Sequence, residues 1–161
     1  MNIDDLIIED LIWTNTQFVN VEDLFNKSSI FLNEKKYVVK EYGFELIKRE
    51  KKYPTGLHTK TIDVAIPHTD AQFVKTPFIF VIRTDGVCEF QQMGSLPDNE
   101  DKVFPKFIFI LGFNKNEMQL QLLSTLMKLF NDEQFMNKIL DASKKDLYKL
   151  LKEKIKEETI L

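Results

Sequence analysis

Two uninterrupted apolar segments, at residues 77–82 and 107–111, place the strongest constraint on how this chain can fold. Both are short and contain many β-branched or aromatic residues, which favours strands. A strand with one face toward water alternates polar and apolar residues, whereas a strand covered on both faces can be apolar throughout. We therefore expect two central strands of a sheet with helices packed on both of its faces.

Weaker strand signals lie around these two segments. In the segment 62–66 every second residue is isoleucine or valine, and Pro67 should end this strand because a proline has no N–H for a neighbouring strand. Residues 11–14 predict a further short strand. Asp85-Gly86 is a turn signal, and we expect it to join two antiparallel strands.

Helix signals fill the N-terminal third. Asn20 suits the N-cap of a helix that should run to about Asn33. Apolar residues at helical spacing predict a second helix over residues 39–52. Pro54 and Gly56 should break the chain after it.

The last third of the chain is predicted to be helical. An apolar stripe at helical spacing indicates one helix, and a second is expected over residues 132–140. Ser143 and Asp146 have the spacing of a capping box, which predicts the start of a final helix. The stripe consists of Leu120, Leu123, Leu126, Met127 and Phe130.

These elements indicate the α/β class, with a mixed β-sheet flanked by helices on both faces. Hydrophobic residues make up 43% of the 161 residues, which is enough for a real core, and no repeat or low-complexity linker divides the chain. We therefore interpret residues 1–161 as a single domain.

Charge and cysteine content exclude several classes of protein. The formal net charge of −3 disfavours a nucleic-acid partner, which would need a basic face. The lone Cys88 permits neither an internal disulfide nor a thiolate metal cluster, and we expect it to fill space in the core. The acidic N-terminus does not resemble a signal peptide, and no apolar run is long enough to insert into a membrane. We expect a cytoplasmic protein.

The two histidines, His58 and His68, are the first candidates for chemistry. His68 follows Pro67 at the expected C-terminal end of a strand, where ligands tend to bind in open α/β sheets. A neutral imidazole is a good nucleophile near neutral pH. His58 lies in the segment 56–59, expected to be a turn, where it is either a second site histidine or, as we expect, an exposed residue.

Two motifs at a defined spacing carry a family resemblance. Arg49-Glu50 precedes a Pro54-Thr55-Gly56 turn, and Ile66-Pro67-His68 follows a dozen residues later. This pairing resembles the enzyme IIA components of bacterial sugar phosphotransferase systems, in the fructose/mannitol-type superfamily. The Pro-Thr-Gly form of the turn looks most like the galactitol-type branch, and the likeness extends over nearly the whole chain.

The resemblance implies a phosphoryl carrier. His68 would accept a phosphoryl group on Nε2 from the phosphocarrier protein HPr and pass it to a cysteine of a cognate enzyme IIB, which serves the membrane component IIC. No cofactor or metal is implied. Arg49 would stabilise the transferred group, and Thr55 and Gly56 would contribute a hydroxyl and close backbone N–H groups.

Two of these assignments have alternatives. Arg49 could instead pair with Glu45 or Glu50 at the end of its helix. Many relatives carry a second histidine where this chain has Gln119. An amide donates hydrogen bonds without titrating, so Gln119 either contacts the phosphoryl group or, with Asn116, forms a capping box.

Other activities find less support in the sequence. His58, His68 and Asp70 lack the spacing of zinc motifs. The acidic run 98–101 lacks the spacing of a calcium loop and should be a solvated turn. No glycine-rich nucleotide loop is present. The main alternative is a regulatory module that uses the same phosphohistidine to bind partners according to phosphorylation state.

Overall fold

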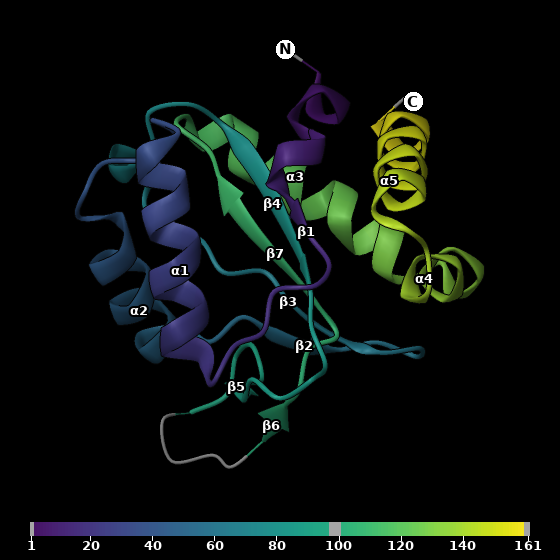
Figure 1. Ribbon diagram of the computed structural model, residues 1–161, viewed down its shortest axis with the longest axis horizontal. Helices are drawn as coiled ribbons and strands as arrows, with labels where there is room; N and C mark the ends of the chain where they lie inside the picture. Colours follow the sequence, from purple (N-terminus) through teal and green to yellow (C-terminus); the bar gives the residue numbers. More distant parts are fainter. Residues whose placement is uncertain (1, 97–100, 160–161) are drawn as a thin grey trace.

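The computed structural model describes residues 2–96 and 101–159, and it has a mixed sheet between two layers of helices (Figure 1). The strand order in this five-stranded sheet is β1-β4-β7-β3-β2. Most of the acidic run 98–101 lies outside the described residues. The strands are β1 (Ile12–Trp13), β2 (Gly56–His58), β3 (Asp63–Ala65), β4 (Phe78–Arg83) and β7 (Phe107–Gly112), with β5 (Phe90–Gln91) and β6 (Lys102–Val103) in a second sheet.

The two apolar segments are the central strands, as their composition predicts. β4 pairs antiparallel with β7, from Phe78 opposite Gly112 to Arg83 opposite Phe107. β3 runs parallel to β7, β1 runs parallel to β4, and β2 closes the far edge antiparallel to β3. All residues of these two strands except Arg83 are buried, because both faces of the sheet are covered.

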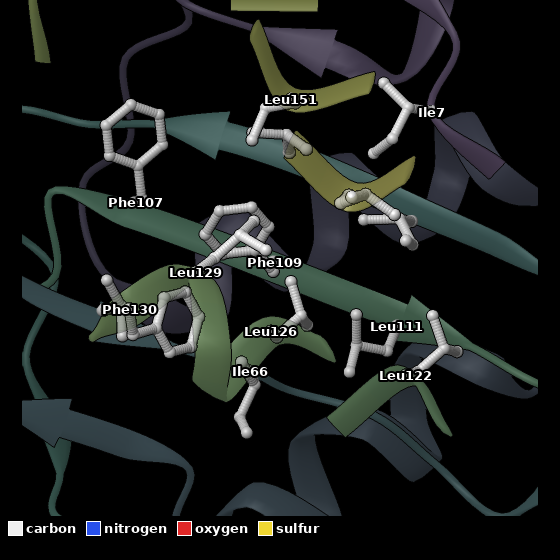
Figure 2. Packing of buried hydrophobic residues seen from close by; sticks show 14 of the residues in the cluster. Ile7, Ile66, Phe107, Phe109, Leu111, Leu122, Leu126, Leu129, Phe130 and Leu151 are labelled. Carbon is white, nitrogen blue, oxygen red and sulfur yellow. The ribbon is translucent and has the colours of Figure 1, made fainter. Parts of the chain in front are cut away.

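Helices cover the two faces separately, which confirms the α/β class (Figure 1). α1 and α2 lie on one side of the sheet, and α3, α4 and α5 lie on the other. Figure 2 shows side chains of α3 and α5 against those of β7. The helices are α1 (Val21–Glu34), α2 (Tyr42–Lys52), α3 (Asn116–Phe130), α4 (Glu133–Leu140) and α5 (Lys144–Thr159), and short 3₁₀ turns occur at Ile3–Leu6, Glu9–Leu11 and Ala71–Phe73.

Side-chain caps fix where several helices begin. The Asn20 side chain accepts a hydrogen bond from the Asp23 backbone N–H at 2.8 Å, and the Asp23 carboxylate accepts one from Val19 N–H at 2.9 Å. These bonds satisfy N–H groups that have no partner inside the helix, as the sequence predicts. At α5, the Ser143 hydroxyl accepts from the Asp146 N–H at 3.1 Å, so the expected start is also confirmed.

Two local predictions about turns are wrong. Asp85-Gly86 makes a bend, with Gly86 at φ +77°, but it does not join paired strands. Both edges of β4 are already occupied by β1 and β7, so the chain continues into the separate β5–β6 sheet. The expected turn at 56–59 is largely strand β2, because its backbone pairs with β3.

The apolar stripe on α3 is also rotated from its predicted position. Leu120 is 75% exposed, whereas Leu122, Leu126 and Leu129 are buried against the sheet. Leucines occur on almost every side of this helix, so their spacing alone does not predict which face is buried. In the described part of the chain, no helix is long and apolar enough to span a membrane.

Candidate functional site

The candidate site lies where two parallel strands end together. The chain leaves β3 through Ile66 and Pro67 and reaches His68, while β7 leads through Gly112 to Phe113. The Leu111 N–H donates to the Pro67 carbonyl at 2.9 Å, which holds the two segments side by side. As a result, the His68 ring lies 5.7 Å from the Phe113 ring, measured between centroids.

His68 is held in one defined protonation state. Its Nδ1 atom lies 2.8 Å from the Ile66 carbonyl oxygen. A carbonyl oxygen can only accept, so Nδ1 carries the proton and Nε2 carries the lone pair. The side chain is buried, with 8% exposure for the residue, and this burial lowers the pKa of His68 below 6.5, with a smaller contribution from the Arg49 charge. The imidazole is therefore neutral near pH 7.

Arg49 reaches the same region from the last turn of α2. Its Nη1 donates to the Asp70 carboxylate at 2.9 Å, so the pairing with Glu45 or Glu50 that the sequence left open is not formed. Its guanidinium carbon lies 5.4 Å from the centre of the Tyr53 ring. Its Nε is buried and has no hydrogen-bond partner among the described residues.

A small hollow of about 180 Å³ brings these segments together. It is lined by residues of α2, of the loop after His68 and of the start of α3. Among the described residues, Arg49 is the one cationic side chain in its lining. The first turn of α3 presents the positive end of a helix dipole, which favours an anion. The lining residues are Arg49, Thr69, Asp70, Ala71, Phe113, Asn116 and Gln119.

Gln119 lies in this hollow and does not cap its helix. The N-cap of α3 is Lys115, and no side chain bonds to the cap. The capping-box alternative for Asn116 and Gln119 is therefore wrong, because Asn116 is already the first helical residue. Both amides are instead lining residues of the hollow that contains Arg49.

Thr55 and Gly56 are not lining residues of the hollow, and His68 is not one either. The Thr55 hydroxyl and backbone N–H both donate to the Glu50 carboxylate, each at 2.7 Å, so they fix the turn after α2. Gly56 is required by packing, since a Cβ there would approach Gln91 O to 2.6 Å and Val103 Cβ to 2.8 Å.

Three further predictions concern His58, a metal site and Cys88. His58 is half-exposed on the edge strand β2, and its Nδ1 pairs with Asp63 at 2.7 Å. It is not a lining residue of the hollow. Over residues 2–96 and 101–159, no group of three potential ligands could hold a metal ion. Cys88 is buried in the core, as expected.

On sequence grounds, Asp70 was weighed only as a possible metal ligand, and Phe113 was not considered. Asp70 lies only two positions after His68 and has the charge opposite to that of Arg49, which is a usable signal. Phe113 gives no such signal in a chain with fourteen phenylalanines. Only the pairing of β3 with β7 brings it to the histidine.

Comparison with known families identifies the chain. Residues 5–154 match the family described as phosphoenolpyruvate-dependent sugar phosphotransferase system, EIIA 2. This chain is a member of that EIIA family. The match includes the hollow, both flanking helix layers and the central sheet, and it confirms the resemblance that the Arg49 and His68 motifs indicated.

Individual relatives agree with this family. Galactitol-specific EIIA components of Escherichia coli strains K12 and O157:H7 are 32% identical over 81 residues, 50% of this EIIA chain and 51% of theirs. The chain thus spans about half the length of these curated relatives. The nitrogen regulatory protein IIA-Ntr of Neisseria meningitidis is 25% identical, with a TM-score of 0.74 over 92% of this chain and 98% of that one. E. coli IIA mannitol is 20% identical, with a TM-score of 0.67 over 88% and 96%.

Proposed function

We propose that this EIIA chain carries a phosphoryl group on His68, taking it from phospho-HPr and giving it to a cysteine of a cognate enzyme IIB. One observation carries the proposal: the Nδ1–H of a buried, neutral imidazole is tied to the Ile66 carbonyl. The remaining nitrogen, Nε2, then carries the lone pair and is the nucleophile. Family membership supplies the class of reaction.

Both transfer steps leave the proton on Nδ1 of His68. In the first step, Nε2 of His68 attacks phosphorus. The bond between phosphorus and the donor imidazole breaks, and its electron pair returns to the donor nitrogen. The phosphorylated ring keeps its Nδ1 proton, and the Ile66 carbonyl stabilises the positive charge that the ring gains. When a thiolate of IIB attacks, the P–Nε2 bond breaks and neutral His68 is restored.

Arg49 and Gln119 act on the phosphoryl oxygens in this proposal. Transfer of this kind depends mainly on positioning and on stabilising charge on the equatorial oxygens. The buried Nε of Arg49 has no hydrogen-bond partner within residues 2–96 and 101–159, and a guanidinium matches two oxygens at once. The Gln119 amide, another lining residue of the hollow, supplies a neutral donor.

Proteins that this chain resembles support the proposed IIB partner. E. coli enzyme IIA mannitol has been solved in complex with phosphorylated enzyme IIB mannitol, and the fold is shared. The galactitol-specific relatives suggest uptake of galactitol or a related sugar through a membrane IIC component. Such a carrier works in the cytoplasm and needs no cofactor.

Phosphorylation in a reconstituted system tests the proposal directly. Purified chain is incubated with phosphoenolpyruvate, enzyme I and HPr, and peptides are analysed for an acid-labile phosphate. We expect a single phosphate on His68 and none in His68→Gln, which keeps a polar side chain at the site. An unlabelled chain beside fully phosphorylated HPr, or label that persists in His68→Gln, would contradict the assignment.

A regulatory role is the second candidate, and the likeness to IIA-Ntr of N. meningitidis favours it. The same phosphohistidine would then control binding to other proteins. Chase of the labelled chain with candidate sugar-specific IIB domains separates the two roles. Loss of label from His68 to a IIB cysteine supports transport, whereas label retained with every IIB supports regulation.

A further inference from the structure

We infer that Tyr53 is a positioning residue that holds the guanidinium of Arg49 in place during phosphoryl transfer; this inference rests on the proposed function. Tyr53 is the residue that ends α2, one turn after Arg49. Its ring centre lies 5.4 Å from the guanidinium carbon. Its backbone N–H donates to the Arg49 carbonyl at 2.7 Å, so backbone and side chain link the same two residues.

A ring contact leaves the donors of the guanidinium available. The charge of an arginine is attracted to the face of an aromatic ring, and this attraction does not require a hydrogen bond from its N–H groups. Nη1 donates to Asp70, and Nε has no partner among the described residues. Tyr53 can therefore hold Arg49 without using the hydrogen bonds that a phosphoryl group needs.

The ion pair with Asp70 cannot hold the Arg49 guanidinium in place through a whole transfer cycle. The Asp70 side chain is 67% exposed, and an ion pair so open to water contributes little. A phosphoryl group on His68 also carries more negative charge than a carboxylate and competes for the same donors. Arg49 would exchange Asp70 for the phosphoryl oxygens, and the Tyr53 ring is the contact that persists through this exchange.

A purely structural role for Tyr53 has less support. The residue is 54% exposed, so its side chain fills no core space. The ring also lies 5.3 Å from the Lys52 ammonium, which is the competing explanation for its position. Lys52→Ala is therefore the matched control, because it removes that neighbour and leaves Arg49 in contact.

The test compares single-turnover transfer from phospho-HPr in wild type, Tyr53→Phe and Tyr53→Leu. A cation–π contact at an exposed site corresponds to a rate loss of about 2- to 5-fold in Tyr53→Leu. Tyr53→Phe should retain the wild-type rate, since it keeps the ring, and Lys52→Ala should do the same. The loss should appear in the transfer rate at saturating phospho-HPr, not only in the concentration needed for half-saturation.

A double mutant gives the decisive readout. If Tyr53 acts through Arg49, Tyr53→Leu should have no further effect in an Arg49→Ala background. Equal losses in both backgrounds, or a wild-type rate in Tyr53→Leu, would overturn the inference while His68 remains labelled. A wild type that HPr cannot label at all would instead overturn the proposed function, and this inference with it.

Discussion

The Nδ1 atom of His68 lies 2.8 Å from the carbonyl oxygen of Ile66, two residues earlier in the chain. Pro67 separates them and fixes its own φ near −65°, so the carbonyl and the ring are joined by a short, stiff connection. This bond selects the tautomer with a free Nε2. The chemistry of the site thus depends on a local backbone bond and on the burial around it.

The first prediction concerns the pH dependence of phosphoryl acceptance. Burial lowers the pKa of His68 below its ordinary value of 6.5, so the neutral form persists to more acidic pH than in a free imidazole. We expect the transfer rate to be nearly constant between about pH 7 and 8 and to fall at acidic pH with a midpoint below that of a free imidazole. Nitrogen NMR of the imidazole should show a proton on Nδ1, with His68→Gln identifying the signal. A proton on Nε2 at pH 7.5 would contradict the arrangement.

A second prediction separates catalysis from stability at Arg49. Arg49→Ala should slow transfer by about 100-fold, the cost of removing a charged donor from a developing anion. Its exposed ion pair with Asp70 should contribute less than about 1 kcal/mol to folding. Arg49→Lys should recover little, since an ammonium cannot make paired bonds.

Lys48→Ala is the control for Arg49, because it removes a positive charge from the exposed face of the same helix. Transfer rate and urea midpoint are measured for each variant. A collapse of the midpoint in Arg49→Ala while transfer persists would assign Arg49 a structural role.

Gln119 gives a third prediction. Gln119→Met keeps the length of the side chain and removes its donor, so transfer should slow by about 3- to 10-fold, or about 1 kcal/mol. Gln119→His should be tolerated and should add a dependence on pH between about 6 and 7, where an imidazole titrates. The rate–pH profiles of wild type and both variants check this. A flat profile for Gln119→His, together with an unchanged rate for Gln119→Met, would remove Gln119 from the site.

The half-buried carboxyl of Glu50 gives a fourth prediction. Burial raises the pKa of Glu50 from 4.5 to about 7, despite its bonds from Thr55. The native state therefore holds a proton that the unfolded chain has released, and the stabilising contribution of this group is lost as the pH rises from about 4.5 to 7. Urea unfolding across this range should show that loss in wild type and a flatter profile in Glu50→Gln. The half-exposed Glu89→Gln serves as the control, and equal profiles for both variants would refute the prediction.

The fold was largely predictable because its signals are local. Continuous apolar runs identify β4 and β7, since only strands covered on both faces can omit polar residues. Asn20 and Ser143 mark helix starts because their side chains bond to N–H groups three residues later. The wrong predictions concern which segments pack against each other. The neighbours of β4, the pairing of β2 and the buried face of α3 all depend on segments that are distant in the sequence.

The sequence by itself determined which groups are available for the chemistry. It supplies the motifs around Arg49 and His68, and it supplies Gln119. Tertiary structure alone decided how these groups are arranged. The pairing of β3 with β7 brings Phe113 to His68, and the packing of α2 directs Arg49 to Asp70 and Tyr53. The sequence specifies which side chains are present. Burial requires that distant segments pack together and exclude water, and this burial lowers the pKa of His68.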